Sequence, residues 1–455
     1  MRQTIIPVGR LLVTLSVVVM LAIAGCASQQ NLTELASAKK MHDVDAAPPS
    51  PPAAARTVQP RAPVSTSVSD TGKREEIKLA RLPDPSSGPA MRTRGARAFA
   101  ATAPTKKSDK FDVVSVFWGT NRRTLDGRNG RLAFAPLNDE QLNLGLAQVT
   151  IPKIGRKPGT LQRPKRYAVL GYEIYKQKAD PRKHFTIGDL KKMTRSQFVA
   201  ATDRVADKST RFKDQAFVFV HGYNTTFEGA VFRTAQLTVD LEFDGLPFLF
   251  SWPSRSQVLA YVHDRDQAEA AEDYFLEYLE LIATKTKAKR IHLIAHSLGT
   301  QLVTAALKSI ANNRAKIARL NIEQIVLAAP DINQKTFAKI ADAIKSAGRA
   351  VTVYASADDQ ALITSKRVAG GLPRVGEVTS AGPVIIPGID TIDITAAGFN
   401  TLWSLNHSTF AKRSHILKDL QLLLERGTRP PDRRMPLYRE LKVAAGQSYW
   451  KYFGN

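Results

Sequence analysis

The sequence predicts an α/β fold in which helices cover both faces of a mostly parallel central sheet. Short apolar runs at 216–220 (AFVFV), 246–250 (LPFLF) and 291–295 (IHLIA) have the composition of strands buried on both faces. Segments with helical periodicity separate these runs, and such alternation is typical of parallel β-α-β units. A hydrophobic content of 43% is sufficient for a sizeable core.

Extra strands are expected at the N-terminal end of the folded domain, which we place at 111–427. Residues 111–118 (FDVVSVFW) are rich in β-branched and aromatic side chains, and this composition favours a strand. Further strands are expected at 131–137, 144–152 and 165–176. The domain therefore opens with sheet.

The rest of the domain is expected to alternate helices with strands. An amphipathic helix is predicted over 265–286, where apolar side chains recur at helical spacing. The other expected elements are strands at 216–224, 246–254, 290–297, 322–332, 350–359 and 390–398, and helices at 225–241 and 298–313, with helical segments around the last strands.

Ser297 lies where a buried strand runs directly into a helix, in the stretch RIHLIAHSLGT. Such a turn is the nucleophile elbow, usually written G-x-S-x-G. The positions two before and two after the serine must be small, and here they are Ala295 and Gly299. We predict that Ser297 is a nucleophile rather than a structural serine, and that Ala295 slightly widens the spacing at the elbow.

Two other strand ends carry side chains that could activate this serine. A serine hydroxyl needs a base to take its proton, and the base needs an acid that fixes its tautomer. Asp359 ends one predicted strand, and His407 lies in the loop beyond the last one. The chain order serine, acid, histidine is that of the α/β-hydrolase triad, so we predict Asp359 as the acid and His407 as the base.

Alternatives stay open for the acid and for the base. Asp358 is adjacent to Asp359, and Asp331 ends the preceding strand, where a helix cap is its more usual role. Asp359 is favoured because it heads DQAL, the acid-x-x-aliphatic pattern usual after this strand. His415 is the alternative base, but it lies in a helical pattern and is expected at the surface.

The backbone N–H groups of Leu298 and Tyr223 are the predicted oxyanion hole. Leu298 follows the nucleophile and opens a helix, whose dipole favours negative charge. Tyr223 follows His221-Gly222, and His221 is expected to support this loop by hydrogen bonding. The other histidines are expected to pack or line the pocket (His296), to be structural (His292), or to line the pocket or cap a helix (His263).

Eight blocks of this chain resemble, in order, a bacterial family of esterase/lipase-like α/β hydrolases of unknown function. They are VSVFWGTNR, VFVHGYNTTFEGA, FSWPS, YVHDRDQAEAA, HLIAHSLGT, LAAPDI, YASADDQAL and NHSTF. The resemblance covers residues 110–426, with a weaker echo in AAGQSYWKYF. It implies the α/β-hydrolase fold and places the family's serine, acid and histidine on Ser297, Asp359 and His407.

Residues 1–25 have the organisation of a signal peptide. A positive start precedes an apolar run at 11–24 that is too short to span a membrane comfortably. The run ends in IAGC, which resembles the lipobox of bacterial lipoproteins and makes Cys26 the predicted lipidation site; an uncleaved signal anchor is the alternative. By resemblance to enterobacterial sorting signals, Ala27 favours the outer membrane of the cell envelope over the inner membrane.

The segments on either side of the domain have biased compositions. Residues 26–110 are rich in Pro, Ala and Ser, and we expect a disordered linker. Residues 428–455 are expected to form a basic C-terminal tail.

The net charge indicates which surroundings the protein favours. The chain has 65 Lys and Arg against 41 Asp and Glu, a formal charge of +24, which favours anionic surroundings such as phospholipid headgroups. No zinc-ligand spacing or RNA-binding signature is present, so nucleic acid is not an expected partner. A single cysteine excludes an internal disulfide.

The predicted function is a serine hydrolase, held on the envelope, that cleaves small-molecule or lipid esters through an acyl-enzyme. It needs no metal or organic cofactor. An acyltransferase or amidase with the same triad is one alternative, and a non-catalytic binding protein with a hydrolase fold is another. The Gly- and Pro-rich insertion at 363–388 predicts a loop rather than a helical lid.

Overall fold

The computed structural model describes residues 108–127, 130–164, 166–169, 172–255, 260–358, 372–397, 410–443 and 446–454. The predicted signal peptide and nearly all of the predicted linker lie outside these residues. Asp359 and His407 also lie outside them. Within the described residues, no helix is long and apolar enough to cross a membrane.

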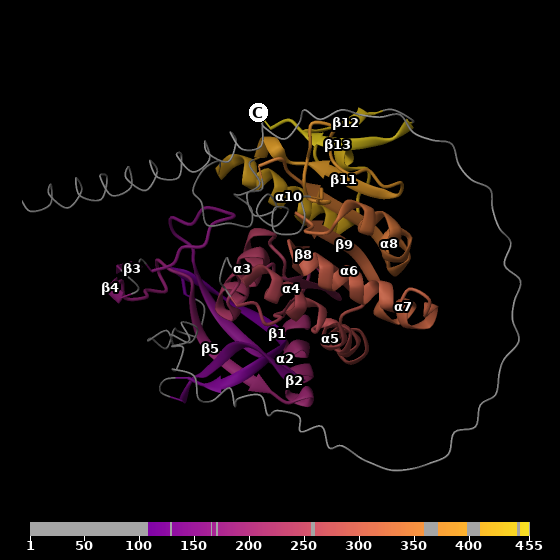
Figure 1. Cartoon of the computed structure of the whole chain (residues 1–455). Helices are drawn as coiled ribbons and strands as arrows, with labels where there is room; N and C mark the ends of the chain where they lie inside the picture. The colour runs from indigo at the N-terminus through magenta and orange to yellow at the C-terminus, as the bar shows by residue number, and fades with distance from the viewer. Residues whose placement is uncertain are drawn as a thin grey trace, which may run out of the picture. The chain divides into compact units, whose positions relative to one another are not determined.

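A single eleven-stranded sheet forms the centre of the domain, in the order β12-β13-β11-β10-β9-β8-β6-β7-β1-β2-β5 (Figure 1). From β1 across to β13 the neighbouring strands are parallel, and β2, β5 and β12 are antiparallel additions. The strands are β1 (Phe111–Asp126), β2 (Leu132–Pro152), β5 (Thr186–Met193), β6 (Gln215–Val220), β7 (Leu246–Phe250), β8 (Arg290–His296), β9 (Ile322–Ala328), β10 (Gly348–Ala355), β11 (Ile389–Asp393), β12 (Tyr438–Lys442) and β13 (Ser448–Tyr452). The short strands β3 (Arg166–Val169) and β4 (Tyr172–Lys176) pair separately.

Helices cover both faces of the sheet, which confirms the predicted fold class. They are α2 (Arg195–Ala206), α3 (Phe227–Asp240), α4 (Tyr261–Glu269), α5 (Glu272–Lys285), α6 (Gly299–Ser309), α7 (Arg314–Leu320), α8 (Gln334–Ala347), α10 (Phe410–Arg426) and the 3₁₀ turns η3 (Thr395–Ala397) and η5 (Pro431–Arg433). Neighbouring strand residues point to opposite faces, so Val218 joins the core under α2, α5, α6 and α8, whereas Phe217 joins the core under α3 and α10.

The long helix predicted at 265–286 is interrupted, and this prediction was wrong in its extent. The interruption falls at Ala270 and Ala271, between α4 and α5. Two anchors hold α4, because Tyr261 donates a hydrogen bond to Asp331 and the buried Asp264 accepts one from Ser254. The apolar side of α5 packs on the sheet instead. Both segments have helical periodicity, so the sequence pattern does not show that α4 and α5 pack against different parts of the domain.

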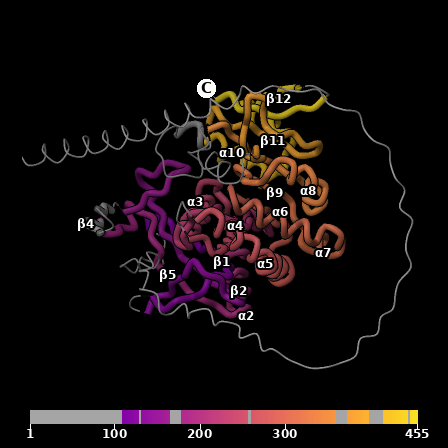
Figure 2. The backbone as a smooth tube through the Cα atoms, viewed as in Figure 1, coloured from indigo at the N-terminus to yellow at the C-terminus, as the bar shows by residue number. Residues whose placement is uncertain are grey.

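The C-terminal segment is not a tail, which corrects the expectation for 428–455. It carries β12 and β13, and β13 pairs in parallel with β11 at the end of the main sheet. Figure 2 shows α10 running beside this part of the sheet. The basic composition of this segment did not indicate strands, because its cations have different surroundings. Arg434 is buried, whereas Arg439 and Lys442 are exposed on β12.

A buried ion pair joins this C-terminal segment to the core. Arg434 Nε donates to Asp419 Oδ1 of α10 at 2.8 Å, and Tyr354 of β10 donates to the other carboxylate oxygen at 2.5 Å. Burial opposes the charge of Arg434, but the adjacent Asp419 carboxylate more than offsets this and raises the pKa of Arg434 above its ordinary value. Neither charge of the pair is exposed to water.

Asp419→Ala should strongly destabilise the domain, because it leaves the Arg434 guanidinium buried without its counter-charge. We expect the free energy of unfolding to fall by about 3–5 kcal/mol, measured by denaturant titration. Glu277→Ala, which breaks an exposed pair with Arg195, is the control and should cost less than about 1 kcal/mol. Equal losses in the two variants would contradict a structural role for the buried pair.

Candidate active site

Ser297 occupies a sharp turn between the end of β8 and the start of α6. Its φ is +50°, in the left-handed region that side chains with a Cβ rarely adopt. Its N–H donates to the Ala328 carbonyl at 2.9 Å, and the residue is only 4% exposed. Positive φ at a buried serine between a strand and a helix is the geometry of a nucleophile elbow.

The close packing at this turn depends on glycine at position 299. A Cβ on Gly299 would overlap the His221 carbonyl oxygen and would lie 2.9 Å from that of Val220. Ala295 is fully buried, and it pairs with Val220 of β6 and Leu327 of β9. The elbow therefore accommodates a methyl group before the serine but not after it. The wider spacing that we expect at Ala295 stays a prediction.

The loop after β6 lies directly against the serine. A Cβ on Gly222 would be 2.9 Å from the Ser297 Cβ, so the Gly222–Tyr223 peptide is adjacent to the serine side chain. Leu298, on the other side, is buried and already has helical φ and ψ at the start of α6. The turn thus brings Ser297 together with the two residues whose N–H groups we predicted as oxyanion donors.

His221 supports this loop by hydrogen bonding, as we expected. Its Nδ1 lies 2.8 Å from the Gly222 carbonyl oxygen and its Nε2 lies 3.0 Å from Ser251 Oγ. The ring stacks on Trp252, whose indole N–H donates to the His221 carbonyl at 2.8 Å. Burial, and then the nearby Arg122 cation, lower the pKa of His221 to about 3. The imidazole is therefore neutral at physiological pH.

Arg122 is a buried member of the site that the sequence reasoning missed. Its guanidinium donates to Ser251 Oγ, to the Ser254 carbonyl and to the Thr225 carbonyl at 2.9–3.1 Å. Burial lowers its pKa to about 10, and the carboxylates of Glu228 and Asp264 oppose that shift, so the side chain stays charged at neutral pH. An arginine just after a buried strand, in GTNRR, was the available signal.

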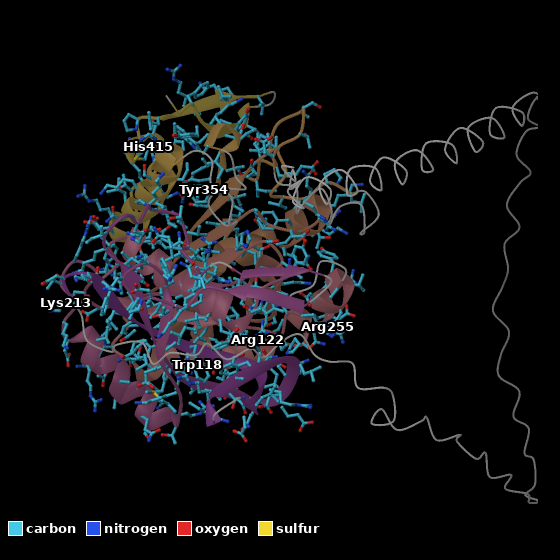
Figure 3. The ribbon with its side chains drawn as sticks, turned by 90° about the vertical axis from the view of Figure 1, so that its left-hand side faces the viewer. Trp118, Arg122, Lys213, Arg255, Tyr354 and His415 are labelled. Atoms are coloured by element: carbon cyan, nitrogen blue, oxygen red, sulfur yellow. The ribbon has the colours of Figure 1, made fainter. Side chains whose placement is uncertain are left out.

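Asp264 is a second buried charge that the sequence reasoning did not single out. It accepts hydrogen bonds from Ser254 Oγ at 2.6 Å and from the backbone N–H groups of Arg255 and Asn224 at 2.8 and 3.3 Å. Asn224 follows Tyr223 in the loop after β6, whereas Ser254 and Arg255 follow β7. Together, Arg122 of β1 and Asp264 of α4 join the loops after β6 and β7 (Figure 3, which labels Arg122 and Arg255).

Asp331, an alternative triad acid, is committed to other partners. Its carboxylate accepts a hydrogen bond from the Tyr261 hydroxyl at 2.8 Å and lies 3.3 Å from the Arg374 guanidinium, with both charged side chains buried. The helix cap considered for Asp331 is wrong, because Asn333 caps α8 by accepting from Thr336 N–H at 3.1 Å.

The predicted acid and base follow β10 and β11. Asp359 and His407 lie outside the described residues, so their roles stay predictions. The alternative acid Asp358 is exposed, and its N–H donates to Ser356 Oγ at 3.2 Å. The alternative base His415 is half-buried on α10, and its Nδ1 is 2.8 Å from the Tyr452 hydroxyl.

Three other histidines, His292, His296 and His263, have structural surroundings. His292 is fully buried and its Nε2 lies 2.8 Å from the Gln215 side chain, as expected of a structural histidine. His296 is near Gly222, and burial and the Arg233 cation lower its pKa to about 3. His263 lies on α4 beside the carboxylate of the next residue. Among the described residues, no group of His, Cys, Asp and Glu is placed to hold a metal ion.

A family model described as an alpha/beta hydrolase of unknown function (DUF900) matches residues 197–426, just over half of the chain. The chain belongs to this family. In this α/β hydrolase the matched region includes the serine turn and the loop after β6. It does not include Arg122 or the β12–β13 hairpin.

Other proteins show more distant similarity to this α/β hydrolase. An uncharacterized protein of Nostoc sp. is 35% identical over 74 residues, which cover 16% of this chain and 19% of that protein. A protein of Lactobacillus plantarum described as a cell surface hydrolase is 14% identical, with a TM-score of 0.31, over 50% of this chain and 97% of its own. Carboxyl esterase 2 of Tuber melanosporum is 12% identical, with a TM-score of 0.29, over 73% and 89%. The fold assignment rests on the strand order and the family match.

The positive φ of Ser297 predicts an unusual order of stability among its variants. The free energy of unfolding of Ser297→Gly should be about 1 kcal/mol higher than that of Ser297→Ala, because glycine has no Cβ and adopts this backbone without strain. The control is Ala305→Gly in the interior of α6, which should lose about 1 kcal/mol. Denaturant titration measures all three, and a Ser297→Ala variant as stable as Ser297→Gly would exclude strain at the turn.

Proposed function

We propose that this α/β hydrolase is a serine hydrolase that cleaves carboxylic esters through an acyl-enzyme. The observation that carries the proposal is Ser297, held at φ +50° between β8 and α6 and flanked by the Gly222–Tyr223 peptide and Leu298. Strain of this kind persists where the surrounding packing enforces it, and a serine presented in this way is typical of a nucleophile.

In the proposed reaction, Ser297 Oγ attacks the ester carbonyl carbon while His407 takes the hydroxyl proton. The carbonyl oxygen becomes an oxyanion that accepts hydrogen bonds from the N–H groups of Tyr223 and Leu298. Each preorganised donor of this kind contributes about 2.7–4 kcal/mol in enzymes where one was removed. The start of α6 adds its favourable dipole at the same point.

The second half of the proposed reaction restores the serine. His407 returns the proton to the leaving alcohol, and Asp359 holds the imidazole tautomer and stabilises its charged form. Water, activated by the same histidine, then attacks the acyl-enzyme and releases the acid. The strand order supports an acid in the loop that contains Asp358. This loop follows β10, and β10 lies two strands from β8, which leads to Ser297.

An acyltransferase or amidase with the same residues is the second candidate. Its acyl-enzyme would pass the acyl group to an alcohol or amine, or would form from an amide. Product formation only when an alcohol or amine is added would favour the transferase over the esterase.

We also propose that Cys26 carries a lipid anchor on the cell envelope, with the outer membrane as its location. The support is the position of the chain's single cysteine directly after an apolar run and a small-residue pair. A basic chain of formal charge +24 is compatible with anionic phospholipid headgroups close by.

A fluorophosphonate probe should label the wild-type protein and should not label Ser297→Ala. The hydrolysis of a p-nitrophenyl ester should fall by about 10⁴-fold or more in that variant, because the acyl-enzyme cannot form. Ser309→Ala, at the far end of α6, is the matched control and should keep both labelling and turnover. Labelling that persists in Ser297→Ala would exclude Ser297 as the nucleophile.

Cys26→Ala should abolish lipid attachment and membrane retention. Incorporation of a palmitate analogue and fractionation of membranes measure the two effects, and Ser28→Ala is the neighbouring control that should behave as wild type. If Cys26→Ala still incorporates the analogue, or if the wild-type chain never does, the lipid-anchor proposal is wrong.

A further inference from the structure

We propose that Arg122 is a positioning residue for the oxyanion hole. Through Ser251 and His221 it determines the direction of the Tyr223 N–H. The inference rests on the proposed function, because it concerns the donor that would meet the oxyanion. It comes from a chain of hydrogen bonds that runs from Arg122 of β1 through Ser251, after β7, to His221, after β6.

The first link leaves no choice of donor. The Arg122 guanidinium has N–H groups and no acceptor, so its Nε must donate to Ser251 Oγ at 3.0 Å. The Ser251 hydroxyl accepts this bond and keeps its own proton for another partner. His221 Nε2 lies 3.0 Å away. Donation to His221 Nε2, which then acts as the acceptor, gives the Ser251 proton a partner.

The second link follows from the neutral imidazole. When Nε2 accepts, the proton of the ring resides on Nδ1. Nδ1 lies 2.8 Å from the Gly222 carbonyl oxygen, which can only accept. The Ser251 hydroxyl and the Gly222 carbonyl thus both favour the Nδ1–H tautomer. Stacking on Trp252 fixes the ring plane in which this proton lies.

The third link concerns how this tautomer orients the Gly222–Tyr223 peptide. The Gly222 carbonyl and the Tyr223 N–H belong to one trans peptide, in which the two groups point in opposite directions. The hydrogen bond from His221 draws the carbonyl toward the buried network. The Tyr223 N–H consequently points the other way, from a peptide that lies against Ser297.

Arg122 also holds the far side of the same loop. Its second N–H donates to the Thr225 carbonyl at 2.9 Å, and its third donates to the Ser254 carbonyl at 3.1 Å. The loop that carries the Tyr223 N–H is thus held at Gly222 through His221 and at Thr225 directly by Arg122. A flipped peptide would present a carbonyl oxygen to the reacting ester and would repel the oxyanion.

Ser251→Ala tests the relay while keeping the Arg122 charge. On a p-nitrophenyl ester, we expect kcat to fall about 10- to 100-fold with KM within about threefold, because the donor acts on the transition state. Thr150→Val, which removes a fully buried hydroxyl from β2, is the matched control and should keep the wild-type kcat. An unchanged kcat in Ser251→Ala, or a loss confined to KM, would overturn the proposal.

The tautomer of His221 gives a second readout that does not depend on turnover. In the full chain labelled with ¹⁵N-histidine, the His221 resonance, assigned with His221→Gln, should show Nδ1–H in the wild type and a mixture of tautomers in Ser251→Ala. A wild-type Nε2–H tautomer would overturn the proposal. If the fluorophosphonate probe fails to label Ser297, the proposed function falls, and this resonance still decides the relay.

Discussion

The close approach of the serine turn to the end of β6 is the constraint on which the site depends. Gly299 leaves no room for a side chain against the carbonyls of Val220 and His221. This contact places the start of α6 beside the loop after β6, next to Ser297 with its left-handed backbone. Ser297 and the two residues predicted as oxyanion donors are then neighbours because two chain segments pack without a gap.

Buried charge secures this arrangement from two directions. Arg122 and Asp264 join the loops after β6 and β7, and Asp331 with Arg374 joins the end of β9 to the segment that precedes β11. Such groups add little net stability, because their desolvation offsets their attraction. They specify a single geometry instead, since each donor has a defined acceptor. The site is therefore held by directional bonds, and the core beneath it supplies the stability.

The central sheet and the elbow could be predicted because they rest on local patterns. The apolar runs at β6, β7 and β8 identify strands buried on both faces, and the small residues around Ser297 identify the turn. The role of Arg122 could not be predicted, because its hydrogen-bond partners lie more than a hundred residues away in the sequence, in the loops after β6 and β7. For the same reason we assigned Arg434 to a basic tail, although it forms a buried ion pair with Asp419.

The β12–β13 hairpin has a consequence for self-association. Without it, the parallel strand β11, buried along most of its length, would expose its backbone hydrogen-bonding groups to other chains. The hairpin covers that side and ends the sheet at β12, a short strand that carries Arg439, Glu440 and Lys442 toward solvent. Charged side chains on an outermost strand disfavour pairing between molecules. The C-terminal segment thus protects the edge of the central sheet from pairing with other molecules.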